Sequence, residues 1–188
     1  PHRSTDPELH DYRGYAGRMA GGVLKVGDEV MVLPSGLTSS VAAIDLFEDE
    51  LDHIYPPLSA TVRLADDLDV SRADMIRRPQ NAPEPRPDID AIVCWMVNDP
   101  LIPRRKLAIK HTTRSARAVV RDIQYRMDIN TLHRDLEADQ LGLNEIGRVQ
   151  LRTTEPLLCD PYAVNRTTGS FILIDESTGV TVGAGMIN

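Results

Sequence analysis

Short runs in which apolar and polar residues alternate recur along the chain, and turn residues separate them. The run A-T-V-R-L at 60–64 shows the alternation that is typical of a strand with one buried face. Further strands are predicted at 29–33, 40–46, 91–97, 106–110, 116–126, 149–152, 171–174 and 180–182. Many short strands with turns between them are typical of sandwiches and barrels, so the pattern predicts an all-β chain.

Two runs depart from simple alternation. The residues at 91–97, A-I-V-C-W-M-V, are continuously apolar, which predicts a strand buried on both faces with Cys94 in the core. The run N-T-L-H-R-D-L-E at 130–137 is the one helical candidate, and we expect a short element or turn region there.

The C-terminal residues combine glycines with hydroxyl side chains. The loop D-E-S-T-G separates the apolar runs at 171–174 and 180–182, which predicts a hairpin with Gly179 in the left-handed conformation. Gly183-Ala-Gly185 could suggest a phosphate cradle, but such a loop must lead into a helix, and only three residues follow. We therefore expect these glycines to let a strand bend at a barrel corner.

Four prolines fall within residues 79–87, where they disfavour both helix and central strand. We read this segment as a stiff linker that couples two bodies. The predicted organisation is one antiparallel barrel over 1–80, a linker over 81–87 and a second barrel over 88–188. The fold class is thus two consecutive antiparallel β-barrels.

The charge distribution adds one candidate interaction surface. The net charge of the 188 residues is −7, which argues against a general binder of nucleic acid or acidic membranes. Residues 101–126 nevertheless carry eight basic side chains against one acidic one. We expect a possible interface with a partner or a neighbouring domain at Arg104, Arg105, Lys110, His111, Arg114 and Arg117. For His111 itself, a solvated barrel edge is the expected environment.

No complete catalytic constellation is visible in the chain. The five histidines and the two cysteines, Cys94 and Cys159, lie outside metal-ligand spacing, and the P-loop pattern is missing. We therefore predict no catalytic, cofactor-binding or metal-binding residue. Two unpaired cysteines suggest a reduced, cytoplasmic protein, and no run of ~18 apolar residues predicts a membrane span. The first residue is Pro1, so we expect a piece of a longer protein.

Several runs resemble a known superfamily. Residues 17–30, G-R-M-A-G-G-V-L-K-V-G-D-E-V, resemble the signature of the second domain of translation-factor-type GTPases, in which Gly27-Asp28 forms the corner before a strand. A narrower resemblance is to the GTPase subunit of ATP sulfurylase, also called sulfate adenylyltransferase subunit 1. It rests on runs at 11–18, 32–36, 69–74, 125–132, 143–149, 165–175 and 181–187.

This resemblance implies the fold of domains 2 and 3 of elongation factor Tu. It implies that GTP and Mg²⁺ bind in an N-terminal domain outside this chain. It also implies pairing with a catalytic subunit that makes adenosine 5′-phosphosulfate and pyrophosphate from ATP and sulfate, driven by GTP hydrolysis. In some relatives an adenylylsulfate kinase domain follows. The barrels alone are expected to be inactive, and they would couple the GTPase domain to the catalytic subunit.

The chain departs from the family pattern at two positions. The chain has S-R-A-D at 71–74 where the family has S-R-G-D, which suggests that Ala73 needs no positive φ. It has Gly179 where the family has Asn, a mild change because both residues tolerate the left-handed region. One rival is an independent small-molecule enzyme on a β-barrel, which no acid/base pair, nucleophile or metal set supports. The other is an elongation factor that binds aminoacyl-tRNA through the basic residues. The net charge of −7 and the 4% of aromatic residues argue against it.

Overall fold

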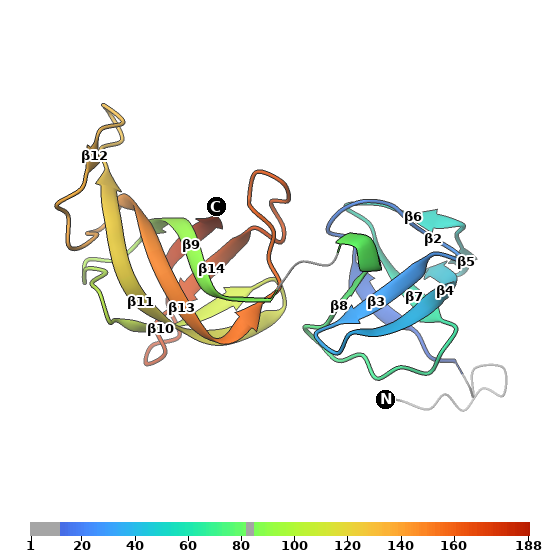
Figure 1. Cartoon of the computed structure of the whole chain (residues 1–188). Helices are drawn as coiled ribbons and strands as arrows, with labels where there is room; N and C mark the ends of the chain where they lie inside the picture. The colour runs from blue at the N-terminus through green and yellow to red at the C-terminus, as the bar shows by residue number, and fades with distance from the viewer. Residues whose placement is uncertain (1–11, 82–84) are drawn as a thin grey trace. The chain divides into compact units, whose positions relative to one another are not determined.

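The computed structural model describes residues 12–81 and 85–188, and their regular structure is strands apart from one 3-10 turn at Pro79–Asn81 (Figure 1). The all-β prediction is confirmed. The chain divides into two compact units, Pro1–Ala82 and Pro83–Asn188. No helix in the described residues is long and apolar enough to cross a membrane.

The first unit contains eight described strands. They are β1 (Tyr15–Arg18), β2 (Leu24–Lys25), β3 (Glu29–Leu33), β4 (Leu37–Leu46), β5 (Asp49–Glu50), β6 (His53–Ile54), β7 (Ser59–Leu64) and β8 (Met75–Arg77). Five form an antiparallel path in the order β1-β7-β4-β3-β8, β5 pairs with β4, and β2 pairs with β6 separately. Leu24 and Ile54 from this small pair share one core with Val30 and Ile44 of the larger sheet. Packing therefore completes the barrel where the hydrogen-bonded ladder is interrupted.

The second unit is a closed antiparallel barrel. Its strands are β9 (Arg86–Trp95), β10 (Lys106–His111), β11 (Arg114–Met127), β12 (Arg134–Asp135), β13 (Ile146–Leu157), β14 (Ser170–Ile174) and β15 (Thr181–Ile187). Six of them run in the order β10-β14-β15-β9-β13-β11, and pairing of β10 with β11 closes the ring. Closure leaves these six strands without a free sheet edge. Figure 1 shows β12 at the end of an arm beyond β11.

Burial alternates along β9, which corrects the expectation of a strand buried on both faces. Val93 and Trp95 are fully buried in the barrel core, whereas Ile92 and Cys94 are half-buried on the outer wall. The reason is that a single-layered barrel has one interior, so each strand needs only one core face. An apolar outer face made the run look doubly buried. Cys159, by contrast, is buried.

The C-terminal hairpin forms as predicted between β14 and β15. Gly179 has a φ of 71°, which confirms its left-handed conformation. The Ser177 hydroxyl and the backbone N–H groups of Thr178 and Ser177 lower the pKa of Asp175 to about 2, because all three donate to its carboxylate. The loop is thus organised by one ionised side chain.

One local expectation was confirmed and one was wrong. The helical candidate at 130–137 is a turn followed by β12, within the expected short element or turn region, because the Asp128 carboxylate accepts the N–H groups of Asn130 and Thr131 and closes a tight turn. Ala73 has a φ of 82°, so the turn does require the left-handed region at this position. The Asp74 N–H donates to the Ser71 carbonyl across that turn, and Ala73 occupies the place that usually favours glycine.

Parts of the predicted linker have regular structure. Pro79–Asn81 forms the 3-10 turn, and β9 begins at Arg86, which pairs with Leu157 of β13. Residues 82–84 lie outside the described residues. The stiffness of the linker stays a prediction.

Candidate functional site

The six predicted interface residues lie on the β10–β11 side of the second barrel. Arg104 and Arg105 are in the loop before β10, where the Arg104 N–H donates to the Val120 carbonyl at 2.7 Å. Lys110, His111, Arg114 and Arg117 are on the paired strands β10 and β11, with His111 opposite Arg114 and Ala108 opposite Arg117. The structure therefore brings all six to one side of the barrel, but their environments differ.

Arg105 is a structural residue. Its side chain is only 16% exposed, its guanidinium lies 5.1 Å from the centre of the Trp95 ring, and Nη1 donates to the Pro100 carbonyl at 2.8 Å. Its ion pair with Asp99 spans 2.8 Å. These contacts hold the loop before β10 against the barrel, so little of Arg105 remains for a partner.

His111 is also buried, which corrects the expectation of a solvated edge. The residue is 2% exposed, and its Nε2 lies 2.7 Å from the Thr168 carbonyl oxygen. Burial lowers the pKa of His111, while the Thr168 hydrogen bond and the Asp160 charge act against this shift. The side chain is therefore a neutral donor in the barrel core and is withdrawn from any interface.

The remaining basic residues form a smaller exposed group. Arg117 makes a 2.8 Å ion pair with Glu176, and Arg114 Nη1 lies 3.4 Å from the Pro156 carbonyl. Arg104 and Lys110 are exposed and take part in no ion pair among the residues that the structure describes. The usable positive charge is thus much smaller than the sequence suggested.

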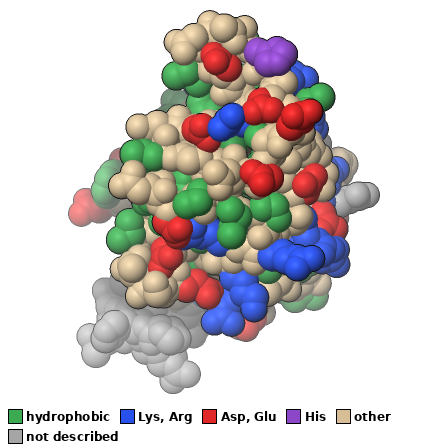
Figure 2. Space-filling model, turned by 90° about the vertical axis from the view of Figure 1, so that its left-hand side faces the viewer, with side chains coloured by type: hydrophobic (Ala, Val, Ile, Leu, Met, Phe, Trp, Pro, Cys, Tyr) green, Lys and Arg blue, Asp and Glu red, His purple; other side chains and the backbone are tan. Residues whose placement is uncertain are grey.

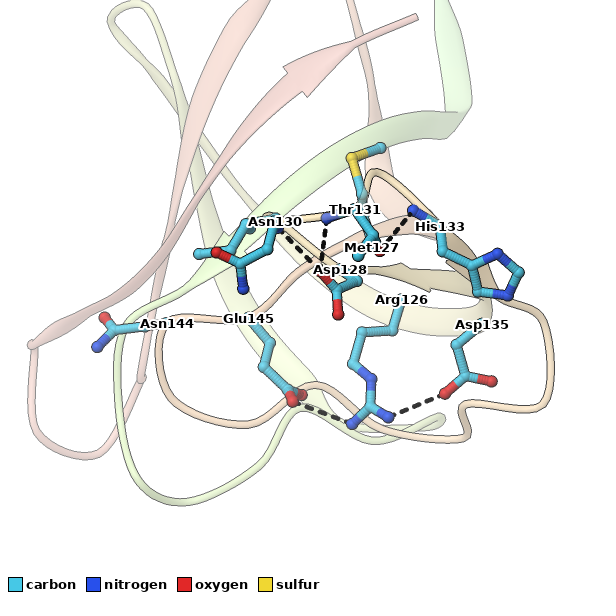
Figure 3. A pocket seen from close by; sticks show the side chains of 10 residues that line it. Arg126, Met127, Asp128, Asn130, Thr131, His133, Asp135, Asn144 and Glu145 are labelled. Atoms are coloured by element: carbon cyan, nitrogen blue, oxygen red, sulfur yellow. Dashed lines mark hydrogen bonds and ion pairs between the residues drawn. The ribbon is translucent and has the colours of Figure 1, made fainter.

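A polar pocket that the sequence did not predict lies at the base of the β12 arm. Its volume is about 670 Å³, and ten residues line it: Arg126, Met127, Asp128, Ile129, Asn130, Thr131, His133, Asp135, Asn144 and Glu145 (Figure 3). Arg126 spans two carboxylates, with Nη2 at 2.9 Å from Asp135 and Nη1 at 3.0 Å from Glu145. The Asp135 carboxylate, and then that of Glu145, raises the pKa of Arg126. The pocket wall is therefore cross-linked by ion pairs.

Asp128 organises the turn beside this pocket. Its Oδ1 accepts the N–H groups of Asn130 at 2.8 Å and of Thr131 at 2.9 Å. The Thr131 bond, followed by that of Asn130, lowers the pKa of Asp128, so this carboxylate is ionised at neutral pH. The signal in the sequence was the D-x-N-T spacing at 128–131, which is typical of a turn closed by an aspartate.

The glycine-rich run at 183–185 is part of the sheet. Gly183, Ala184 and Gly185 lie inside β15 and pair with both β14 and β9, so their backbone groups belong to the sheet. The described residues contain no cluster of three or more histidine, cysteine or acidic side chains that could hold a metal ion.

The fold defines a class of protein: the two-barrel body found in translation-factor-type structures. A crystal structure of Sup35 complexed with GDP matches with a TM-score of 0.81 at 18% identity, covering 93% of this chain and 45% of that chain. A structure of Sup35 complexed with GMPPNP matches with a TM-score of 0.80 at 19% identity. At these identities the likeness shows the fold alone.

The family follows from the second barrel. Residues 88–188 match the model for the GTP-eEF1A C-terminal domain-like family, and the chain belongs to that family. It is 51% identical over 181 residues to the bifunctional enzyme CysN/CysC of Mycobacterium tuberculosis, covering 96% of this chain and 30% of that protein. It is 44% identical to sulfate adenylyltransferase subunit 1 of Alteromonas mediterranea, covering 94% and 37%. The predicted resemblance to that subunit is confirmed, and the chain spans about a third of these relatives.

Proposed function

We propose that this chain is the barrel segment of the GTP-hydrolysing subunit of a sulfate adenylyltransferase. The observation that carries the proposal is the 51% identity to a CysN/CysC enzyme over 96% of the chain. Such identity over two barrels exceeds what a shared fold requires, since Sup35 has the same fold at 18% identity. The chain's contribution is to assembly and coupling.

In this proposal the longer protein uses GTP hydrolysis to drive formation of adenosine 5′-phosphosulfate and pyrophosphate from ATP and sulfate. As the family resemblance implies, GTP and Mg²⁺ would bind in a domain that precedes the barrels, and Gly183-Ala-Gly185 of this chain is paired within the sheet. Loops that respond to the γ-phosphate would change their contacts with the barrels. A closed barrel suits this role because a ring of paired strands moves as one body.

The proposed partners are the catalytic subunit, the protein's own GTPase domain and, since one relative is named a bifunctional enzyme, a fused second domain, for which the family resemblance implies an adenylylsulfate kinase. We place the protein in the cytoplasm. Of the predicted basic residues, Arg104, Lys110, Arg114 and Arg117 remain candidates for a partner or domain interface, since Arg105 and His111 are occupied internally. Lys110 and Arg117 support this choice most directly, because they are exposed on the β10–β11 pair, whereas Arg114 lies opposite the buried His111.

Binding of aminoacyl-tRNA is not favoured. The net charge is −7, and ion pairs to acidic side chains engage Arg105, Arg117, Arg126 and Arg148. A site for RNA needs uncompensated positive charge along the phosphate backbone. The 44% identity to sulfate adenylyltransferase subunit 1 also argues against a role in binding tRNA.

Titration calorimetry tests the proposal with two ligands, the purified catalytic subunit from the same organism and an aminoacyl-tRNA. We expect saturable binding of the catalytic subunit and weak, salt-sensitive binding of the RNA. Tight RNA binding with no response to the catalytic subunit would overturn the proposal. An Arg114→Glu/Arg117→Glu variant then shows whether the basic residues belong to the interface, because unchanged affinity would remove them from it.

A further inference from the structure

The β12 arm, residues 127–136, presents apolar side chains that nothing in the described structure covers. Leu136 is 73% exposed, Leu132 71% and Ile129 62%, and Leu143 at 45% lies next to the pocket residue Asn144. Figure 2 shows hydrophobic side chains exposed among acidic ones on one face of the molecule. Aliphatic side chains held this far into solvent on a projecting arm are typical of a contact surface.

The backbone holds one of these leucines outward at an energetic cost. Leu132 has a φ of 58°, in the left-handed region that is unfavourable for a residue with a Cβ atom. Its N–H donates to the Asp128 carbonyl at 2.8 Å, and the Asp128 N–H donates to the His133 carbonyl at 2.9 Å. The arm is therefore ordered before any partner binds, which lowers the entropy lost on binding.

The pocket beside these side chains carries an excess of negative charge. One guanidinium, that of Arg126, stands among the carboxylates of Asp128, Asp135 and Glu145. Asp135 and Glu145 are shared with Arg126, whereas Asp128 makes no ion pair among the described residues (Figure 3). A lysine or arginine side chain of a partner would balance this negative charge. The exposed side chains of Ile129, Leu132 and Leu136, which form an apolar rim beside the pocket, would then pack against apolar residues of the same partner. A small ion could satisfy the carboxylates but would leave the aliphatic rim in water.

Most residues of the pocket lie in sequence runs that distinguish the sulfurylase GTPase subunit from other two-barrel proteins. Six of the ten lining residues lie within 125–132 and two within 143–149, the runs that carry the narrower resemblance to the sulfurylase GTPase subunit. Those runs therefore meet at one surface. The barrel fold alone does not require these particular residues, because most of the pocket residues lie outside the strands that form the barrel wall.

We propose that the β12 arm and its pocket dock the catalytic subunit of sulfate adenylyltransferase. The partner inserts a lysine or arginine side chain beside Asp128 and packs apolar side chains on Ile129, Leu132 and Leu136. This inference rests on the proposed function for the identity of the partner. The pocket, the charge and the exposed side chains specify its chemistry.

Three variants measured by calorimetry with the purified catalytic subunit test this docking site. Leu132→Asn/Leu136→Asn removes apolar contact area, and asparagine tolerates the left-handed φ at 132, so we expect about tenfold weaker binding with unchanged stability. Asp128→Asn keeps an oxygen acceptor for the turn but removes the charge, so affinity should fall and depend less on salt. Val164→Asn is the control, because Val164 is 77% exposed but lies outside the arm.

The outcomes separate the two proposals. If the original chain binds the catalytic subunit and the leucine variant binds equally well, the docking site is wrong and the proposed function stands. If the original chain does not bind at all, the pairing with this subunit fails, and the docking site fails with it. Equal losses in the leucine variant and in Val164→Asn would also overturn the site, since the arm would then have no special role.

Discussion

Gly185 of β15 lies directly opposite Phe171 of β14, and a Cβ atom on Gly185 would stand only 2.1 Å from Phe171 Cζ. The glycine thus makes room for an aromatic ring in the barrel core. Gly183 lies similarly against the Trp95 ring, where a Cβ would stand 3.1 Å from Cε3. These glycines shape the core, and the ladder slips by one residue near Gly183, between Leu173 and Ile174.

Gly185→Ala should therefore destabilise the second barrel by about 1–3 kcal/mol through overpacking. Urea unfolding measures this directly. The cost should shrink in a Phe171→Leu background, because the clash is specific to the ring. Gly142→Ala serves as a control in the same unit, since its new methyl would meet Glu145 Oε2 at an ordinary 3.5 Å. Equal losses at both glycines would refute the role assigned to Phe171.

Ala73→Gly should stabilise the first unit by about 0.5–1 kcal/mol. Ala73 has a φ of 82°, where glycine avoids the steric cost that an L-residue bears. Ala42→Gly, at an exposed position in β4, should instead destabilise by about 0.5–1 kcal/mol. Thermal unfolding of the two variants should therefore show shifts of opposite sign, and a loss of stability in both would contradict the assigned turn.

His111 predicts a pH dependence of stability. Burial lowers its pKa in the folded state, so the unfolded chain binds the proton more tightly. Neutral His111 therefore contributes fully to the free energy of unfolding above the unfolded-state pKa of about 6.5. This contribution is lost as the pH falls below that pKa, by at most ~1.4 kcal/mol per pH unit. Urea unfolding at about pH 7.5 and about pH 5.5 tests this. The His111→Gln variant should show a smaller change in the free energy of unfolding between these two pH values, whereas the exposed control His133→Gln should not. If His111→Gln leaves this change unaltered, the pH dependence comes from other groups.

Two arginines from the predicted interface should behave differently on truncation. Arg105→Ala should cost about 2 kcal/mol, because it removes a guanidinium packed on Trp95 and bonded to the Pro100 carbonyl. Arg117→Ala should cost less than about 0.5 kcal/mol, since its ion pair with Glu176 is solvent-exposed. Chemical unfolding of both variants measures the contrast, and similar costs would contradict the structural role of Arg105.

The strands were predictable where the alternation was local. β3 spans Glu29–Leu33 as predicted, and the hairpin loop contains Gly179 in the expected conformation, because neighbouring residues decide both features. The burial of His111 could not be predicted in this way. It depends on Thr168, which is 57 residues away in the chain.

The pocket was hidden for a related reason. Its walls come from residues 126–135 and from Asn144 and Glu145, and the helical candidate at 130–137 overlaps the first of these segments. Side-chain hydrogen bonds from Asp128 compete with helix formation there, and the short apolar pattern is too weak to prevail. The basic residues were visible in the sequence, but Asp175 and Glu176, which pair with Arg105 and Arg117, lie in the distant β14–β15 loop.

A chimera tests the proposed function most directly. This chain would replace the aligned segment of the Mycobacterium tuberculosis CysN/CysC enzyme, which it matches at 51% identity over 181 residues. The assay is synthesis of adenosine 5′-phosphosulfate with the catalytic subunit, with and without GTP. A control chimera carries the Sup35 barrels, which share the fold at a TM-score of 0.81 but only 18% identity. We predict that GTP stimulates synthesis in the first chimera and not in the control. A first chimera that folds and hydrolyses GTP, yet shows no stimulated synthesis, would contradict the proposal.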